Sequence, residues 1–172
     1  MPMSKPQSLL DEFLEAWRYT REGVIAEVAN LPDKALAFRP SEASRTATEL
    51  VQHIIESGQM MAGELSRPDG DFQRRSYPEF LAEYAPGVSR LRTTKALLDA
   101  LTRTHRDGDR QIRSAGEVLM LQQIRQFNGV PATRLSWMHH GIAHEEYHRG
   151  QLALYARLVG RVPALTKEIE GS

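Results

Sequence analysis

Cysteine is absent from this sequence of 172 residues. The chain therefore forms no disulfide bond, offers no thiolate ligand to a metal ion and has no cysteine nucleophile. A metal ion bound by such a protein would be held by nitrogen and oxygen atoms. The composition agrees with an intracellular location, where disulfide bonds are rare.

A net charge and a long apolar run are also lacking. Lys plus Arg and Asp plus Glu number 22 each, so no basic excess indicates nucleic acid as a partner. No apolar run approaches the roughly 20 residues that a membrane-spanning helix needs. Residues 1–7 lack the apolar core of a signal peptide. We therefore expect a cytoplasmic protein with neither a nucleic-acid partner nor a membrane partner.

Apolar residues recur at helical spacing along most of the chain. Thr46 followed by Glu49 predicts a capping box at the start of one helix. We expect four long helices, at Gln7–Leu31, from Thr46 to about Leu65, from about Gly87 toward Arg113, and from Pro131 to Gly160. Together they predict an all-α four-helix bundle that forms a single domain over residues 1–172.

Three segments between these helices are less regular. Residues 66–78 are expected to be loop, and Glu79–Tyr84 a short helix. Residues 116–129 fit either a short extended piece or a helical turn. Gly108 is expected to kink or end the third long helix, and Pro131 to occupy the first turn of the fourth. No stretch gives a convincing strand pattern.

Five of the six histidines fall within two of the predicted helices. His144 and His148 differ by about 40° around a helix and lie about one turn apart along it, so their side chains can converge on one ion. His53, midway along the second long helix, completes a set of three nitrogen ligands if the two helices face each other. Three ligands leave one position open for water or substrate, as in catalytic metal sites. An imidazole that is simply hydrogen-bonded in the core is the alternative for each histidine.

Residues beside these histidines are further candidates. Glu145 can accept a hydrogen bond that orients a ligand imidazole, or act as a general base, and a solvent-facing carboxylate is the alternative. His140 extends the same stripe and is either a substrate contact or a solvated histidine at the mouth of the site. Gly150 suggests a close approach of the second helix, and Gln151 a hydrogen bond across the bundle. Arg149 is expected to be exposed.

The segment His144–Leu152, with the sequence HEEYHRGQL, resembles the last long helix of the DinB-like (DinB/YfiT) superfamily. Thr48–Ile54 resembles the second helix of that family, including its single histidine. The likeness in layout covers nearly the whole chain. It implies a four-helix bundle of up-down-down-up topology, a divalent metal ion held by His53, His144 and His148, and a homodimer.

Known members of the family include thiol S-transferases that use bacillithiol, mycothiol or glutathione, and a mycothiol-dependent isomerase. The resemblance therefore implies a metal-dependent thiol S-transferase for a small-molecule substrate, or a metal-assisted hydrolase. Because the chain lacks cysteine, the thiol would come from a low-molecular-weight cofactor. A metal-binding stress-response or binding module without catalysis is the alternative. Imidazole suits zinc, nickel and iron alike, so the metal is left open.

The residues from His144 to His148 also match the H-E-x-x-H signature of zinc metallopeptidases, with Glu168 as a conceivable third ligand. We rank this hypothesis lower, because no strand pattern supplies an edge for a peptide and Glu168 lies in an expected frayed tail beyond Pro163. A di-iron bundle needs paired Glu-x-x-His motifs, and only Glu145 with His148 matches. A contact of His53, rather than Glu168, with the histidine pair would separate these hypotheses.

Overall fold

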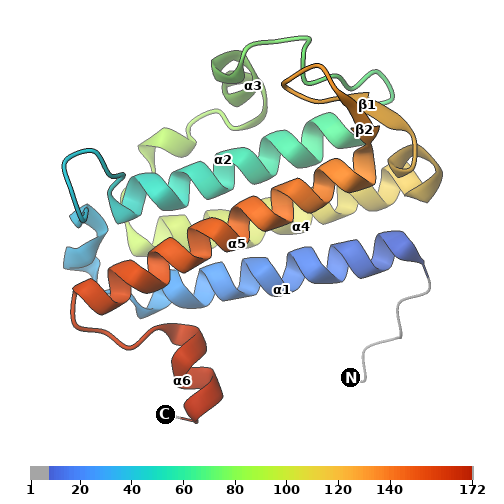
Figure 1. Cartoon of the computed structure of the whole chain (residues 1–172). Coiled ribbons are helices and arrows are strands. Elements are labelled where there is room, and N and C mark those ends of the chain that lie inside the picture. Colours follow the sequence, from blue (N-terminus) through green and yellow to red (C-terminus); the bar gives the residue numbers. More distant parts are fainter. Residues whose placement is uncertain (1–7, 172) are drawn as a thin grey trace.

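Four long helices dominate the structure, a computed structural model that describes residues 8–171 (Figure 1). They are α1 (Leu9–Asn30), α2 (Ala47–Ser66), α4 (Thr94–Met120) and α5 (Arg134–Leu158). The shorter elements are the 3₁₀ turns η1 (Asp33–Ala37) and η2 (Val88–Arg90), the helices α3 (Tyr77–Tyr84) and α6 (Ala164–Glu170), and the strands β1 (Gln123–Arg125) and β2 (Pro131–Thr133). The predicted helix start at Gln7 lies outside the described residues.

The long helices run up, down, down and up, which confirms the predicted fold (Figure 1). The amide of Leu10, at the start of α1, donates to the carboxylate of Glu117 near the end of α4, over 2.8 Å. Arg134, at the start of α5, donates to the carbonyl of Leu65 near the end of α2, also over 2.8 Å. Because α3 and η2 carry the chain back along the bundle, α2 and α4 are parallel, and α2 lies antiparallel to α5.

Side-chain caps explain where the helices begin. The predicted capping box is confirmed, since Thr46 accepts from the amide of Glu49, whose carboxylate accepts from the amide of Thr46. The prediction for Pro131 is wrong, because this residue lies in β2 opposite Arg125 of β1. Thr133 caps α5 instead, accepting a hydrogen bond from the amide of Ser136 over 3.1 Å. The ambiguous residues 116–129 thus include one strand of an antiparallel hairpin.

The interruption of α4 lies at Gly116, where φ is 80°, and not at Gly108 as predicted. A Cβ atom added to Gly108 would lie 2.6 Å from the ring of Trp17, so this glycine allows α1 and α4 to approach closely. The backbone of Gly108 is helical, so the helix continues through this residue. The close packing of Trp17, rather than an unusual backbone angle, requires the glycine.

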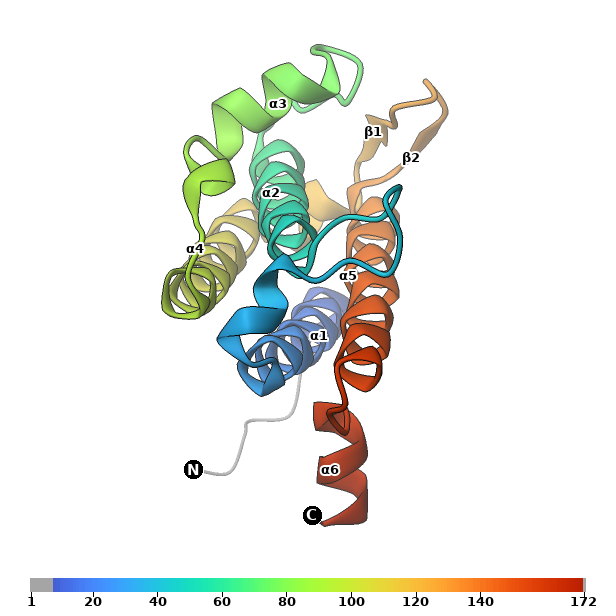
Figure 2. The ribbon, with the colours of Figure 1, turned by 90° about the vertical axis from the view of Figure 1, so that its left-hand side faces the viewer.

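The core consists of two clusters of apolar side chains with a polar layer between them. One cluster contains Val24 and Leu101, and the other contains Trp17 and Ile112. Buried Arg21, Thr104 and Glu145 lie between them along the helices. Figure 2 shows α3 and the hairpin on the same side of the bundle, above α2 and α5. None of the helices within residues 8–171 combines the length and apolar character needed to cross a bilayer.

Candidate metal centre

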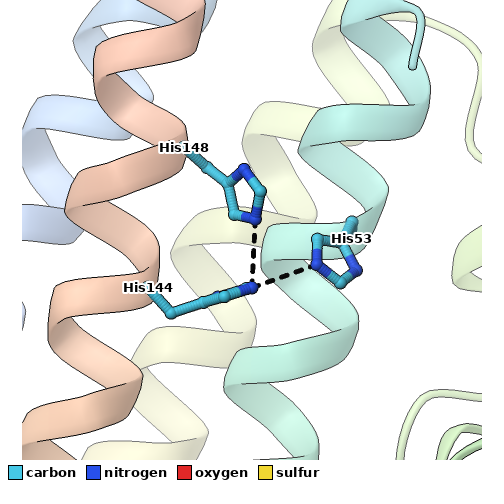
Figure 3. A group of neighbouring side chains, drawn as sticks. All are labelled: His53, His144 and His148. Carbon is cyan, nitrogen blue, oxygen red and sulfur yellow. Dashed lines mark hydrogen bonds between the residues drawn. The ribbon is translucent and has the colours of Figure 1, made fainter. Parts of the chain in front are cut away.

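His53, His144 and His148 converge between α2 and α5 (Figure 3). The Nε2 atom of His144 lies 3.0 Å from Nε2 of His53 and 3.0 Å from Nε2 of His148. One nitrogen from each ring falls within 4.8 Å of the others, so the three can share one ion. Antiparallel packing of α2 and α5 brings His53 to the histidine pair from a distant part of the sequence.

Hydrogen bonds at the far side of two rings favour this orientation. The Nδ1 atom of His148 lies 2.8 Å from Oε1 of Gln151, and since an amide oxygen only accepts, Nδ1 must carry the proton. The Nε2 atom of His148 therefore presents a lone pair toward the cluster. The hydroxyl of Tyr77 lies 3.4 Å from Nδ1 of His53, a longer contact in which either atom can be the donor. Gln151 thus bonds within its own helix, and the predicted bond across the bundle is wrong.

All three imidazoles are held in the neutral form. Burial lowers the pKa of His53 from 6.5 to about 3 and that of His144 from 6.5 to about 4. Burial also lowers the pKa of His148, although its hydrogen bond to Gln151 opposes this effect. The positive charge of Arg45 acts in the same direction as burial on each ring. Neutral imidazole is the form that binds metal, and a divalent cation would replace the contacts between the three Nε2 atoms.

A cavity of about 270 Å³ adjoins the cluster, and His53 and His144 form part of its wall. His140 lines the same cavity, as a substrate contact would, and its ring lies 4.7 Å from that of Trp137. The sequence did not identify Tyr77 or Phe127 as wall residues, because one was assigned to a loop and the other to an ambiguous segment. No local sequence pattern marks these two residues as wall residues, because they reach the cavity only through the path that the chain takes over α2 and α5.

The carboxylate of Glu145 faces α1 and does not take the role that the sequence predicts for it. It accepts from Arg21 over 2.9 and 2.5 Å and from the indole nitrogen of Trp17 over 2.9 Å. Arg21 and Glu145 side chains are 1% and 2% exposed, so the carboxylate is a buried partner of an arginine. No hydrogen bond within residues 8–171 joins Glu145 to a histidine of the cluster, which corrects the expectation that it orients an imidazole. With both oxygens engaged, it is also poorly placed as a general base.

Arg149 and Gly150 differ from the predictions as well. Arg149 is buried, packs against Gly23 of α1 and pairs with Glu146 over 3.1 Å. A Cβ atom at Gly150 would meet open space, so this glycine makes no close approach to α2. The structure offers no packing reason for a glycine at this position.

The structure does not support Glu168 as the third metal ligand of a metallopeptidase. Glu168 lies in α6, which is a helix rather than the frayed tail expected for this segment, and is exposed there. The amide of Ala164 at the start of α6 donates to Glu27 of α1 over 3.0 Å, which holds this helix against α1. His53 takes the place beside the histidine pair, and Glu145 is engaged by Arg21.

A sequence model of the DinB superfamily matches residues 16–152, well over half of the 172 residues. The match includes all three histidines of the cluster. No curated protein matches the chain significantly.

Solved structures share this fold. A DinB-like protein from Bacillus subtilis has a TM-score of 0.67 and 17% identity, with 88% of this chain and 93% of the other covered. A DinB-like protein from Bacillus cereus has a TM-score of 0.64 and 16% identity over the same shares, 88% and 93%. YfiT from Bacillus subtilis, described as a probable metal-dependent hydrolase with an unusual four-helix bundle topology, has a TM-score of 0.69 and 12% identity, with 94% of each chain covered.

Proposed function

This chain belongs to the DinB superfamily, and from that premise we propose that it binds one divalent metal ion through His53, His144 and His148 to activate a nucleophile. The nucleophile would attack a small-molecule electrophile. The observation that carries the proposal is the convergence of three neutral imidazoles beside a cavity large enough for a ligand. The predicted non-catalytic binding module needs no such cavity at the histidines.

The residues around the cluster have defined tasks in this proposal. Gln151 holds the ring of His148 with Nε2 toward the centre, and the hydroxyl of Tyr77 contacts Nδ1 of His53 on the side away from the cluster. Outer hydrogen bonds of this kind orient ligands and raise their basicity. The walls of the cavity limit access of bulk water to the electrophile, since Met60, Met61 and Trp137 are among them.

We propose a low-molecular-weight thiol as the nucleophile, because the chain has no cysteine of its own. A divalent cation would act as a Lewis acid and lower the pKa of a thiol or of water placed beside it. The thiol would lose its proton to solvent and its sulfur would form a bond to an electrophilic carbon, while the leaving group departs with its electron pair. Zinc, nickel and iron all suit three imidazoles.

Hydrolysis is the second candidate, in which water attacks in place of the thiol. The observation that favours it is the structural likeness to YfiT, which is described as a probable metal-dependent hydrolase. A single assay separates the two. Purified protein is incubated with an electrophile and with bacillithiol, mycothiol, glutathione or no thiol, and the conjugated and hydrolysed products are measured. Product formed only with a thiol supports transfer, and product formed without one supports hydrolysis.

Metal dependence is tested separately from the reaction. Zinc or nickel at about 100 times its dissociation constant should stabilise the protein by about 2.7 kcal/mol. His53→Ala should abolish this stabilisation, and His139→Ala serves as the matched control, because His139 is an exposed histidine of α5 outside the cluster. Equal stabilisation of the wild type and His53→Ala, or activity that persists in a chelator, would contradict the proposal. The homodimer that the resemblance implies stays a prediction.

A further inference from the structure

We propose that the cavity beside the three histidines binds an uncharged aromatic group, one or two rings in size. The proposal rests on the proposed function for its purpose, because a ligand bound there would lie against His53 and His144. The aromatic group would belong to the substrate that the nucleophile attacks. The argument comes from the chemistry, volume and position of the cavity walls.

The walls are rich in aromatic rings from three separate elements. Tyr77 comes from α3, Phe127 from the turn of the hairpin and Trp137 from α5. The rings of Phe127 and Trp137 have centroids 6.3 Å apart at 64°, and those of Tyr77 and Phe127 are 6.4 Å apart at 67°. Such inclined rings present both faces and edges, which are the surfaces against which another aromatic ring packs best.

The walls carry no fixed charge. None of the residues that line the cavity in the described chain is Asp, Glu, Lys or Arg. In the metal-free chain, a charged ligand would lose its hydration there without gaining an ion-pair partner, whereas a neutral ring would lose little. Met60 and Met61 add flexible apolar surface that adapts to the outline of a ring.

The volume sets the size of this ligand. An apolar cavity of about 150 Å³ holds one benzene ring. The cavity here is about 270 Å³. This difference leaves room for a second ring or for substituents on the first. Phe127 and Tyr77, 40% and 38% exposed, lie where the wall meets solvent.

Two dyes of nearly identical shape test the charge preference. N-phenyl-1-naphthylamine is neutral, and 8-anilino-1-naphthalenesulfonate adds one sulfonate to the same scaffold. Fluorescence titration of the full chain in chelator should show that the neutral dye binds at least about tenfold more tightly, because the sulfonate finds no partner in the metal-free cavity. Equal affinities, or tighter binding of the sulfonate, would overturn the proposal.

Paired substitutions locate the bound dye. Phe127→Asp and His140→Asp place a charge at the cavity from the hairpin and from α5. Their controls are Val130→Asp in the same hairpin and His139→Asp next along α5, which line no part of the cavity. The first two should weaken binding of the neutral dye about tenfold, and the controls should leave it unchanged. Equal effects of variants and controls would place the dye elsewhere and overturn the proposal. His140 is exposed, so its variant keeps the test decisive if Phe127→Asp disturbs the hairpin.

The titration of the neutral dye is repeated with zinc to separate this proposal from the metal function. The cavity is formed by the chain itself, so the neutral dye should bind with and without zinc. Loss of the zinc-dependent stabilisation with retained dye binding would contradict only the proposed metal function. Retained zinc stabilisation with no dye binding would contradict only the aromatic ligand.

Discussion

His144 and Glu145 are neighbours on α5, yet their side chains face different helices and meet opposite surroundings. Toward α1, the carboxylate of Glu145 is fully engaged by Arg21 and Trp17. Toward α2, the nitrogens of His144 and its partners face one another as neutral groups. A step of one residue turns a helix by about 100°, which is enough to separate these two faces.

One helix thus presents a face that stabilises the fold and a second face for which we propose metal binding. The α1 face satisfies its charges inside the protein, and Arg21 also donates to the carbonyl of Leu101 over 2.9 Å. Gly58 of α2 allows this close packing, since a Cβ atom there would lie 2.7 Å from the guanidinium of Arg21. On the α2 face, Nε2 of His144 contacts Nε2 of His53 and of His148, and a metal ion would replace these contacts. Substitutions on the first face should therefore alter folding, and those on the second should alter metal binding.

The largest expected effect comes from breaking the ion pair. Arg21→Ala leaves a buried carboxylate without its partner and should lower the free energy of unfolding by about 3–5 kcal/mol. Urea unfolding followed by circular dichroism measures this loss. Arg18→Ala is the matched control, because Arg18 pairs with Glu15 and Glu22 at the surface and its loss should change stability by at most about 1 kcal/mol.

A double substitution sharpens this result. Arg21→Met with Glu145→Gln removes both charges and keeps an acceptor for the indole of Trp17. It should recover most of the stability lost in Arg21→Ala, because replacing a buried ion pair by packed neutral groups is often close to neutral. A double variant as unstable as the single one would mean that packing, rather than an unpaired charge, explains the loss.

An intermediate effect is expected on the α2 face. Gln151→Leu removes the acceptor that holds Nδ1 of His148 and should weaken zinc affinity about 10- to 100-fold. Isothermal titration calorimetry measures the affinity, and urea unfolding should show little change in the metal-free protein. Gln111→Leu, at an exposed position of α4, is the control. Unchanged affinity in Gln151→Leu would remove Gln151 from the site.

The smallest expected effect is a pH dependence of the metal-free protein. The pKa values of His53 and His144 fall from 6.5 to about 3 and about 4 on folding. As the pH falls below 6.5, the unfolded chain takes up protons that the folded imidazoles do not bind, so stability declines until the pH reaches the folded pKa, about 4 for His144 and about 3 for His53. The effect is modest because water still reaches both rings.

Melting temperatures in chelator between pH 8 and pH 4, a range chosen to span the ordinary histidine pKa of about 6.5, measure this decline. His53→Asn should flatten the profile, since it removes one of the groups whose pKa changes on folding. His139→Asn should leave the profile as in the wild type. Parallel profiles for the wild type and His53→Asn would show that burial of His53 contributes nothing to the dependence.

Much of the fold could be predicted because helical periodicity is a local property. The apolar spacing located the long helices to within a few residues, except that α4 begins at Thr94 and extends to Met120. Only a short extended piece within residues 116–129 was left open for the hairpin, because its strands have three residues each, too few for an alternating pattern. The close approach of α1 and α4 at Gly108 could not be read either, since it depends on Trp17 of another helix.

By itself, the sequence determined the long helices, the cap at Thr46 and the placement of His144 and His148 on one face, because each follows from residues a few positions apart. Only the tertiary structure decided that His53 meets this pair and that Glu145 turns to Arg21, which lies 124 residues away. It also decided that Tyr77 and Phe127 close the cavity. The physical reason is that the rotation and pairing of helices arise from packing of the whole core, which no local pattern encodes.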